Sequence, residues 1–179
     1  MASIIKNRAV TDDAWQVVRA AEDGALPAVG ALQAGKVLVP FALWQAERAA
    51  LVAAKTKDEL GVWLAPDSEP ADLVADFGAI ALIAVDFPRF ADGRGYSIAR
   101  LLRERHGWMG ELRAIGDVLR DQLYYMERCG FDAFAVRADK DIHDALNAFG
   151  EFSQRYQGAV DNPSPLFRRR ADVAAKVGA

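Results

Sequence analysis

Residues 80–86 read IALIAVD, and this stretch decides the fold class. Six apolar residues in a row end in an aspartate. Such an uninterrupted run is typical of a parallel β-strand whose two faces are both covered by helices. It is far shorter than the roughly 20 apolar residues that cross a bilayer. The run therefore predicts an inner strand of an α/β protein.

Strand-like and helix-like segments alternate on both sides of this run. We expect strands at 36–43, 61–65, 80–86, 111–116 and 131–137, and helices at 45–55, 70–77 and 97–105, then after Asp117 and after Asp139 or Asp141. Ser97, Asp117 and one of the last two aspartates are the expected N-caps. About five βα units imply a mainly parallel sheet with right-handed crossovers. A flavodoxin-like open sheet and a partial barrel both fit, since a complete eight-stranded barrel takes about 250 residues.

The chain is expected to form a single domain, because 179 residues suffice for one hydrophobic core. We predict a β-hairpin that covers the core at 1–18, a loop at 19–35, the βα core at 36–157 and an extended tail at 158–179. The tail contains DNPSPLFRRR, residues 161–170, whose prolines are excluded from a helix interior.

Composition and charge exclude several classes of protein. The net charge of −3 argues against nucleic-acid binding. The first residues, MASIIKNRAVTDD, lack the apolar core and cleavage site of a signal peptide, so we expect a cytoplasmic protein without a membrane anchor. Cys129 is the single cysteine, and the two histidines are His106 and His143, so neither a metal nor another cofactor is expected. Dimers are the commonest assembly of small soluble proteins, and the sequence leaves a homodimer open.

Charged residues gather where the predicted strands end. Residues 86–137 hold nine arginines and no lysine. The carboxyl ends of parallel strands meet at one edge of a sheet, and ligands bind there. The guanidinium fork suits small oxyanions. The predicted anion-binding residues are Arg94, Gly95, Ser97, Arg100, Arg113 and Arg137, with Asp86 and Asp117 as candidate acid–base groups.

Each of these residues also has a structural interpretation. Asp86 can pair with an arginine or cap a turn, and Asp117 can cap a helix. Arg113 lies inside a predicted strand, where it needs a partner such as Glu111.

The tail carries a candidate docking motif, formed by Pro165, Leu166, Phe167 and Arg168. Proline lowers the entropic cost of ordering, and the apolar side chains are typical anchors. The alternative is that the tail clamps onto its own body.

The stretch FADGRGYSIARLLRERHGWMGELRAIGDVLRDQLYYMERCGFDAF, residues 90–134, resembles a bacterial family of unknown function. The tail motif PSPLFRRR and an N-terminal pattern ending in Asp13-Ala-Trp15 share that resemblance. Genes of the family commonly accompany assimilatory sulfite reductase, and members are often labelled probable oxidoreductases involved in sulfite reduction. The resemblance implies a place in sulfur assimilation and cysteine biosynthesis, and it carries over no catalytic residue.

Sulfite reduction needs a siroheme and an iron–sulfur cluster, which one cysteine cannot assemble. We therefore expect an accessory protein that binds a small oxyanion or a pathway enzyme, such as sulfite reductase, through the arginine-rich strand ends. The alternatives are a small acid–base enzyme acting on an anionic substrate and a pure protein-interaction module.

Overall fold

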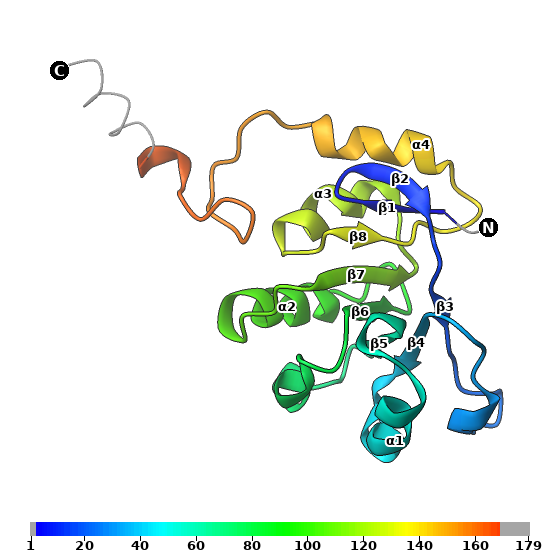
Figure 1. The fold of residues 1–179 in the computed structure, drawn as a ribbon. Helices are drawn as coiled ribbons and strands as arrows, with labels where there is room; N and C mark the ends of the chain where they lie inside the picture. The colour runs from blue at the N-terminus through cyan, green and yellow to red at the C-terminus, as the bar shows by residue number, and fades with distance from the viewer. Residues whose placement is uncertain (1–2, 169–179) are drawn as a thin grey trace.

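The computed structural model describes residues 3–168, in which eight strands form one sheet (Figure 1). The strand order is β2-β1-β8-β7-β6-β5-β4-β3. The parallel strands are β3 (Gln16–Val17), β4 (Val37–Pro40), β5 (Leu60–Leu64), β6 (Leu82–Phe87), β7 (Glu111–Gly116) and β8 (Ala133–Phe134). The hairpin of β1 (Ser3–Lys6) and β2 (Ala9–Asp12) joins them, with β1 antiparallel to β8. The mixed α/β fold and mainly parallel sheet are confirmed, with more strands than expected.

Helices follow the parallel strands. They are α1 (Phe41–Ala54), α2 (Arg94–Arg100) with a π-helical continuation at Leu101–Arg105, α3 (Arg120–Arg128), and α4 (Ile142–Ala145) with a 3-10 continuation at Leu146–Gly150. Short 3-10 turns occupy Val29–Ala31, Lys57–Glu59 and Pro70–Asp76. No helix within residues 3–168 has the length and apolar character needed to span a membrane.

The strand order is that of a curled half-barrel. From β3 to β8, each parallel strand pairs with the next one along the chain. A flavodoxin-like sheet has the order 2-1-3-4-5, with helices on both faces, and this sheet does not have it. With sequential order, right-handed crossovers place every connecting helix on the same face. The partial barrel is therefore the architecture that the strand order supports.

A short link between β2 and β3 explains the curl. These strands lie at opposite edges of the sheet, yet β2 ends at Asp12 and β3 begins at Gln16. Eight flat strands at about 4.8 Å spacing would be roughly 34 Å wide. Four residue steps reach at most about 14 Å. The sheet must curl until its edges approach each other, so residues 9–17 bridge from β1 to β4.

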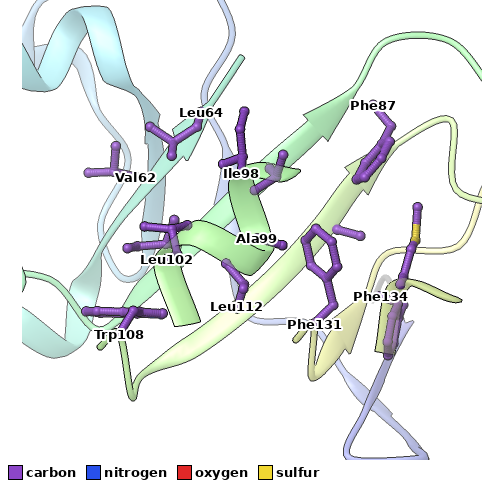
Figure 2. Close-up of a cluster of buried hydrophobic side chains, with 14 of the residues drawn as sticks. Val62, Leu64, Phe87, Ile98, Ala99, Leu102, Trp108, Leu112, Phe131 and Phe134 are labelled. Carbon is purple, nitrogen blue, oxygen red and sulfur yellow. The ribbon is translucent and has the colours of Figure 1, made fainter. Parts of the chain in front are cut away.

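The helices cover only the outer face of the sheet. Ile83, Val85 and Phe87 of β6 belong to the large core cluster that includes the helix residues. Figure 2 shows Ile98 of α2 and Leu102 of its π-helical continuation among the strand side chains of this cluster.

The expectation that helices cover both faces of residues 80–86 is wrong. Leu82 and Ala84 face the inside of the curl, where they form a smaller cluster with Leu38 and Ile115, and Trp15 and Trp63 pack against it. The run is apolar throughout because the curled sheet and the residue 13–19 segment bury its second face.

An ion cluster ties the link to the inside of the sheet. Arg113 of β7 is 1% exposed. It donates through Nη1 to both carboxylate oxygens of Asp13 at 2.9 Å, and through Nε and Nη2 to Glu111 at 2.9 and 2.7 Å. Lys6 pairs with the second oxygen of Glu111 at 2.7 Å. The structural interpretation of Arg113 is confirmed, with Asp13 as an additional partner.

Two of the expected helix caps are wrong. The second helix starts at Arg94, so Ser97 lies inside it, and α3 has Leu119 as N-cap, not Asp117. Asp141 does cap α4, because its side chain accepts from the backbone N–H groups of His143 and Asp144.

The chain ends also differ in part from expectation. The 1–18 segment does form a hairpin, but it continues into β3, which pairs with β4. The expected strand at 131–137 shortens to β8. The tail makes an isolated bridge between Ala159 and Asn162, and a helical turn at 166–168, so it is not simply extended. Residues 169–179 of the predicted tail lie outside the described residues.

Replacing Arg113→Met should lower the free energy of unfolding by about 3–5 kcal/mol, because two largely buried carboxylates lose their guanidinium partner. Urea unfolding followed by circular dichroism measures this loss. Arg94→Ala removes an exposed ion pair and is the control, with a nearly unchanged midpoint. A midpoint for Arg113→Met equal to that of the control would contradict the structural role of the cluster.

Candidate functional site

Asp86 lies on the penultimate residue of β6, at the carboxyl edge of the sheet. It is 7% exposed, and its Oδ1 accepts from Arg19 Nη2 at 2.8 Å. The Arg19 guanidinium lies over the Trp63 ring, 4.8 Å from its centroid. The carboxylate is thus held by an arginine from the link that follows β3, and its predicted pairing with an arginine is what the structure shows.

Gly116 brings the end of β7 against Asp86. Its φ of +93° lies in the left-handed region, which favours glycine. A Cβ here would lie 2.4 Å from the Phe87 carbonyl oxygen and 2.9 Å from Asp86 Oδ1. Only glycine allows this close approach of the two strand ends.

Asp117 follows Gly116 and joins two loops at this edge. Its Oδ2 accepts from the Phe90 N–H at 3.0 Å, and its Oδ1 accepts from Arg137 Nη1 at 2.9 Å. Arg137 also donates to both oxygens of Asp139, at 2.8 and 2.7 Å. These bonds raise the pKa of Arg137 and hold the pKa of Asp139 below its ordinary value. The structure thus places Asp117 and Arg137 together as an ion network, and their catalytic or anion-binding roles stay predictions.

The remaining predicted anion-binding residues do not join this edge as one pocket. Arg94 donates through Nε and Nη2 to Asp92, at 3.0 and 2.7 Å, and Arg113 is enclosed by the ion cluster described above. Gly95 is buried under Phe87, whose ring would lie 2.6 Å from an added Cβ. Each of the four arginines is bonded to a different set of carboxylates, and their shared role in binding an anion stays a prediction.

Ser97 and Arg100 line a separate cavity between α2 and α3, of about 190 Å³. We call it the helix-side cavity. It is lined by Tyr96, Ser97, Arg100, Tyr125, Arg128, Cys129 and residues 157–160. The two predicted residues thus meet side chains that the sequence did not associate with them.

Cys129 forms part of the wall of this cavity and is buried. Burial raises the pKa of its thiol, and a hydrogen bond with Tyr125 and the nearby Arg100 and Arg128 only partly offset this. Burial likewise raises the pKa of the Tyr96 hydroxyl. Both groups are protonated at neutral pH, so the thiol is a poor nucleophile.

The start of the tail is fixed to the amino-end side of the sheet. The Val160 N–H donates to the Arg128 carbonyl at 3.1 Å, and Arg128 Nη2 donates to the Gln157 carbonyl at 2.5 Å. Arg155 donates to the Tyr124 hydroxyl at 3.1 Å and forms an ion pair with Asp161. Residues 155–161 therefore bind α3 of the same chain, and we call them the clamp. The alternative that the PSPLFRRR motif itself clamps onto the body stays a prediction.

A model of a bacterial protein family of unknown function, DUF934, matches residues 61–167, from β5 into the tail. The match spans more than half of the chain. The chain belongs to this family. The matched range contains residues 90–134, whose resemblance indicated the same family, while the Asp13-Ala-Trp15 pattern precedes it. No curated protein and no solved structure matches the chain.

Within residues 3–168, no group of three or more His, Cys, Asp or Glu side chains could hold a metal ion. The sequence of this DUF934 member does not indicate a role for Arg19 or Arg128, which the structure places against Asp86 and in the wall of the helix-side cavity. Arg19 begins a glycine- and proline-containing segment without periodicity, and Arg128 resembles an ordinary charge in the last turn of a helix. No local signal distinguishes either residue, because their partners are distant in sequence.

The thiol of Cys129 should be alkylated by iodoacetamide only slowly at neutral pH. Because burial raises its pKa, the rate should rise at a higher pH in the folded protein than in concentrated urea. Mass spectrometry of the single cysteine gives both pH profiles. An apparent pKa in the folded protein equal to or below that in urea would refute this description.

Proposed function

We propose that the protein is an accessory protein of assimilatory sulfite reduction that docks on a pathway enzyme through residues 163–168, which we call the docking segment. The pathway rests on the resemblance of residues 90–134 and of PSPLFRRR to the family whose genes accompany sulfite reductase. The docking role rests on the position of the segment.

The docking segment extends beyond the clamp and away from the sheet (Figure 1). In the part of the chain that the structure describes, its backbone hydrogen bonds go to Tyr156 and Pro165. The Phe167 side chain is 58% exposed, while Leu166 is half-buried. An exposed aromatic anchor on a separate segment is the observation that carries the proposal.

The chemistry of the segment suits a protein surface. Aromatic and arginine side chains supply most of the energy at interfaces, and Phe167 and Arg168 lie together with the guanidinium over the ring. Pro163 and Pro165 restrict the free chain, which lowers the entropic cost of binding. The expected partner surface has an apolar pocket with acidic groups beside it.

The strand ends offer less support for the other functions. An oxyanion at Arg137 would have to displace carboxylates of Asp117 and Asp139 that already bind the guanidinium. An acid–base enzyme would have to use Asp86 or Asp117, and both carboxylates are engaged with arginines. Docking requires no rearrangement of these pairs.

Removal of the docking segment should weaken binding to sulfite reductase. A protein truncated after Asn162 keeps the clamp of residues 155–161, and Leu166→Ala with Phe167→Ala removes only the two anchors. Both should weaken retention on immobilised sulfite reductase about tenfold or more, because anchor residues dominate such interfaces.

Met109→Ala is the matched control, since this side chain is 90% exposed and lies outside the segment. Equal retention of wild type, the truncated protein and the double variant would rule out docking through residues 163–168. Absence of retention of the wild-type protein would rule out sulfite reductase as the partner.

A further inference from the structure

Arg128 is a largely buried arginine that forms an ion pair with Asp161 but, among the described residues, donates no hydrogen bond to a carboxylate. Arg103, Arg113, Arg128 and Arg155 have side-chain exposures of only 14, 2, 13 and 19%. Three of them donate hydrogen bonds to carboxylates, namely Arg103 to Asp132, Arg113 to Asp13 and Glu111, and Arg155 to Asp161. Arg128 lacks such a bond among the described residues.

The Nε atom of Arg128 is buried and has no hydrogen-bond partner within residues 3–168. Its Nη2 donates to the Gln157 carbonyl, and its Nε forms an ion pair with the Asp161 carboxylate at 3.7 Å, which is too long for a hydrogen bond. A buried donor without an acceptor is costly. The helix-side cavity lies beside this guanidinium.

A second guanidinium and a hydroxyl reach the same cavity from α2. Arg100 and Ser97 are three residues apart, so they lie on one side of the helix. Arg100 pairs with Glu104 at 2.8 Å, and both side chains are largely exposed. Exposed pairs of this kind are weak, so Arg100 can turn to an anion in the cavity at little cost.

The size of the cavity restricts its ligand. About 190 Å³ corresponds to roughly six water molecules at 30 Å³ each. Pockets for larger organic ligands usually measure about 300–1,000 Å³. An ion of four or five heavy atoms with part of its hydration therefore fits.

We propose that the helix-side cavity binds a small oxyanion of the sulfate and phosphate class, between the guanidinium groups of Arg128 and Arg100 and with the Ser97 hydroxyl as a further donor. Arginine forks match the oxygen pairs of such ions. Residues 157–160 close the cavity from the tail side. The site is distinct from the docking segment and does not depend on partner binding.

Isothermal titration with inorganic sulfate, phosphate and sulfite, in chloride buffer of constant ionic strength, tests the site. At least one of these probes should bind wild-type protein with one-to-one stoichiometry and a Kd below about 1 mM. Arg128→Gln and Arg100→Gln should each weaken binding about tenfold or more, because each removes a charge-assisted hydrogen bond. Amide shifts in a nitrogen–proton correlation spectrum should centre on Ser97, Arg128 and residues 157–160.

Arg105→Gln is the matched control, since Arg105 is an exposed arginine near the end of the same helix and lies outside the cavity. It should bind like wild type. If Arg128→Gln fails to fold, the exposed Arg100→Gln still decides the question. Absence of saturable binding to wild type, or equal weakening in Arg100→Gln and Arg105→Gln, would overturn the proposal.

Discussion

The contact between Asp13 and Arg113 is the interaction on which the rest of the structure depends. Arg113 lies on β7, near the middle of the sheet, and Asp13 lies in the link between the two edge strands. Their ion pair holds the link across the inside of the curl. Two residues further on, the ring of Trp15 packs against Gly61 of β5. It lies so close that a Cβ added at Gly61 would be 3.1 Å from the ring. The curl follows from these contacts and from the shortness of the link.

The curl then determines where function can lie. On the inside of the sheet, Trp15 and Trp63 pack against the smaller apolar cluster, and Arg113 forms its ion pairs. At the carboxyl edge the arginines and aspartates neutralise one another. At the edge where the parallel strands begin, Arg128 and the clamp of residues 155–161 hold the tail beside the helix-side cavity. The proposed anion site and the proposed docking segment therefore adjoin along the tail, at residues 157–160 and 163–168.

The sequence predicts the local elements well. The expected strand 111–116 coincides with β7, and IALIAVD overlaps β6, because strand periodicity and apolar runs are local properties. The sequence also indicates that Arg113 needs a charged partner. Asp13 could not be inferred, because the pairing spans 100 residues and arises only when the sheet curls.

The candidate site was predictable only in part. Asp86 and Asp117 do end neighbouring parallel strands, as an alternation of strands and helices implies. The sequence places Ser97 and Arg100 at that edge because it predicts a helix that begins at Ser97. It begins three residues earlier, so both side chains lie along the helix and meet Arg128 from α3 and the tail. Sequence patterns locate the ends of helices only to within one or two residues. They also do not show which distant segment of the chain will contact a helix.

A double-mutant cycle between Asp13→Ala and Arg113→Met tests the central claim most directly. Urea unfolding of wild type, both single variants and the double variant gives the coupling free energy. We predict that the two effects couple by about 1–3 kcal/mol, as expected for contacting residues. Additivity within about 0.5 kcal/mol would show that the two residues do not interact in solution. That result would contradict a sheet held in its curl by this ion pair.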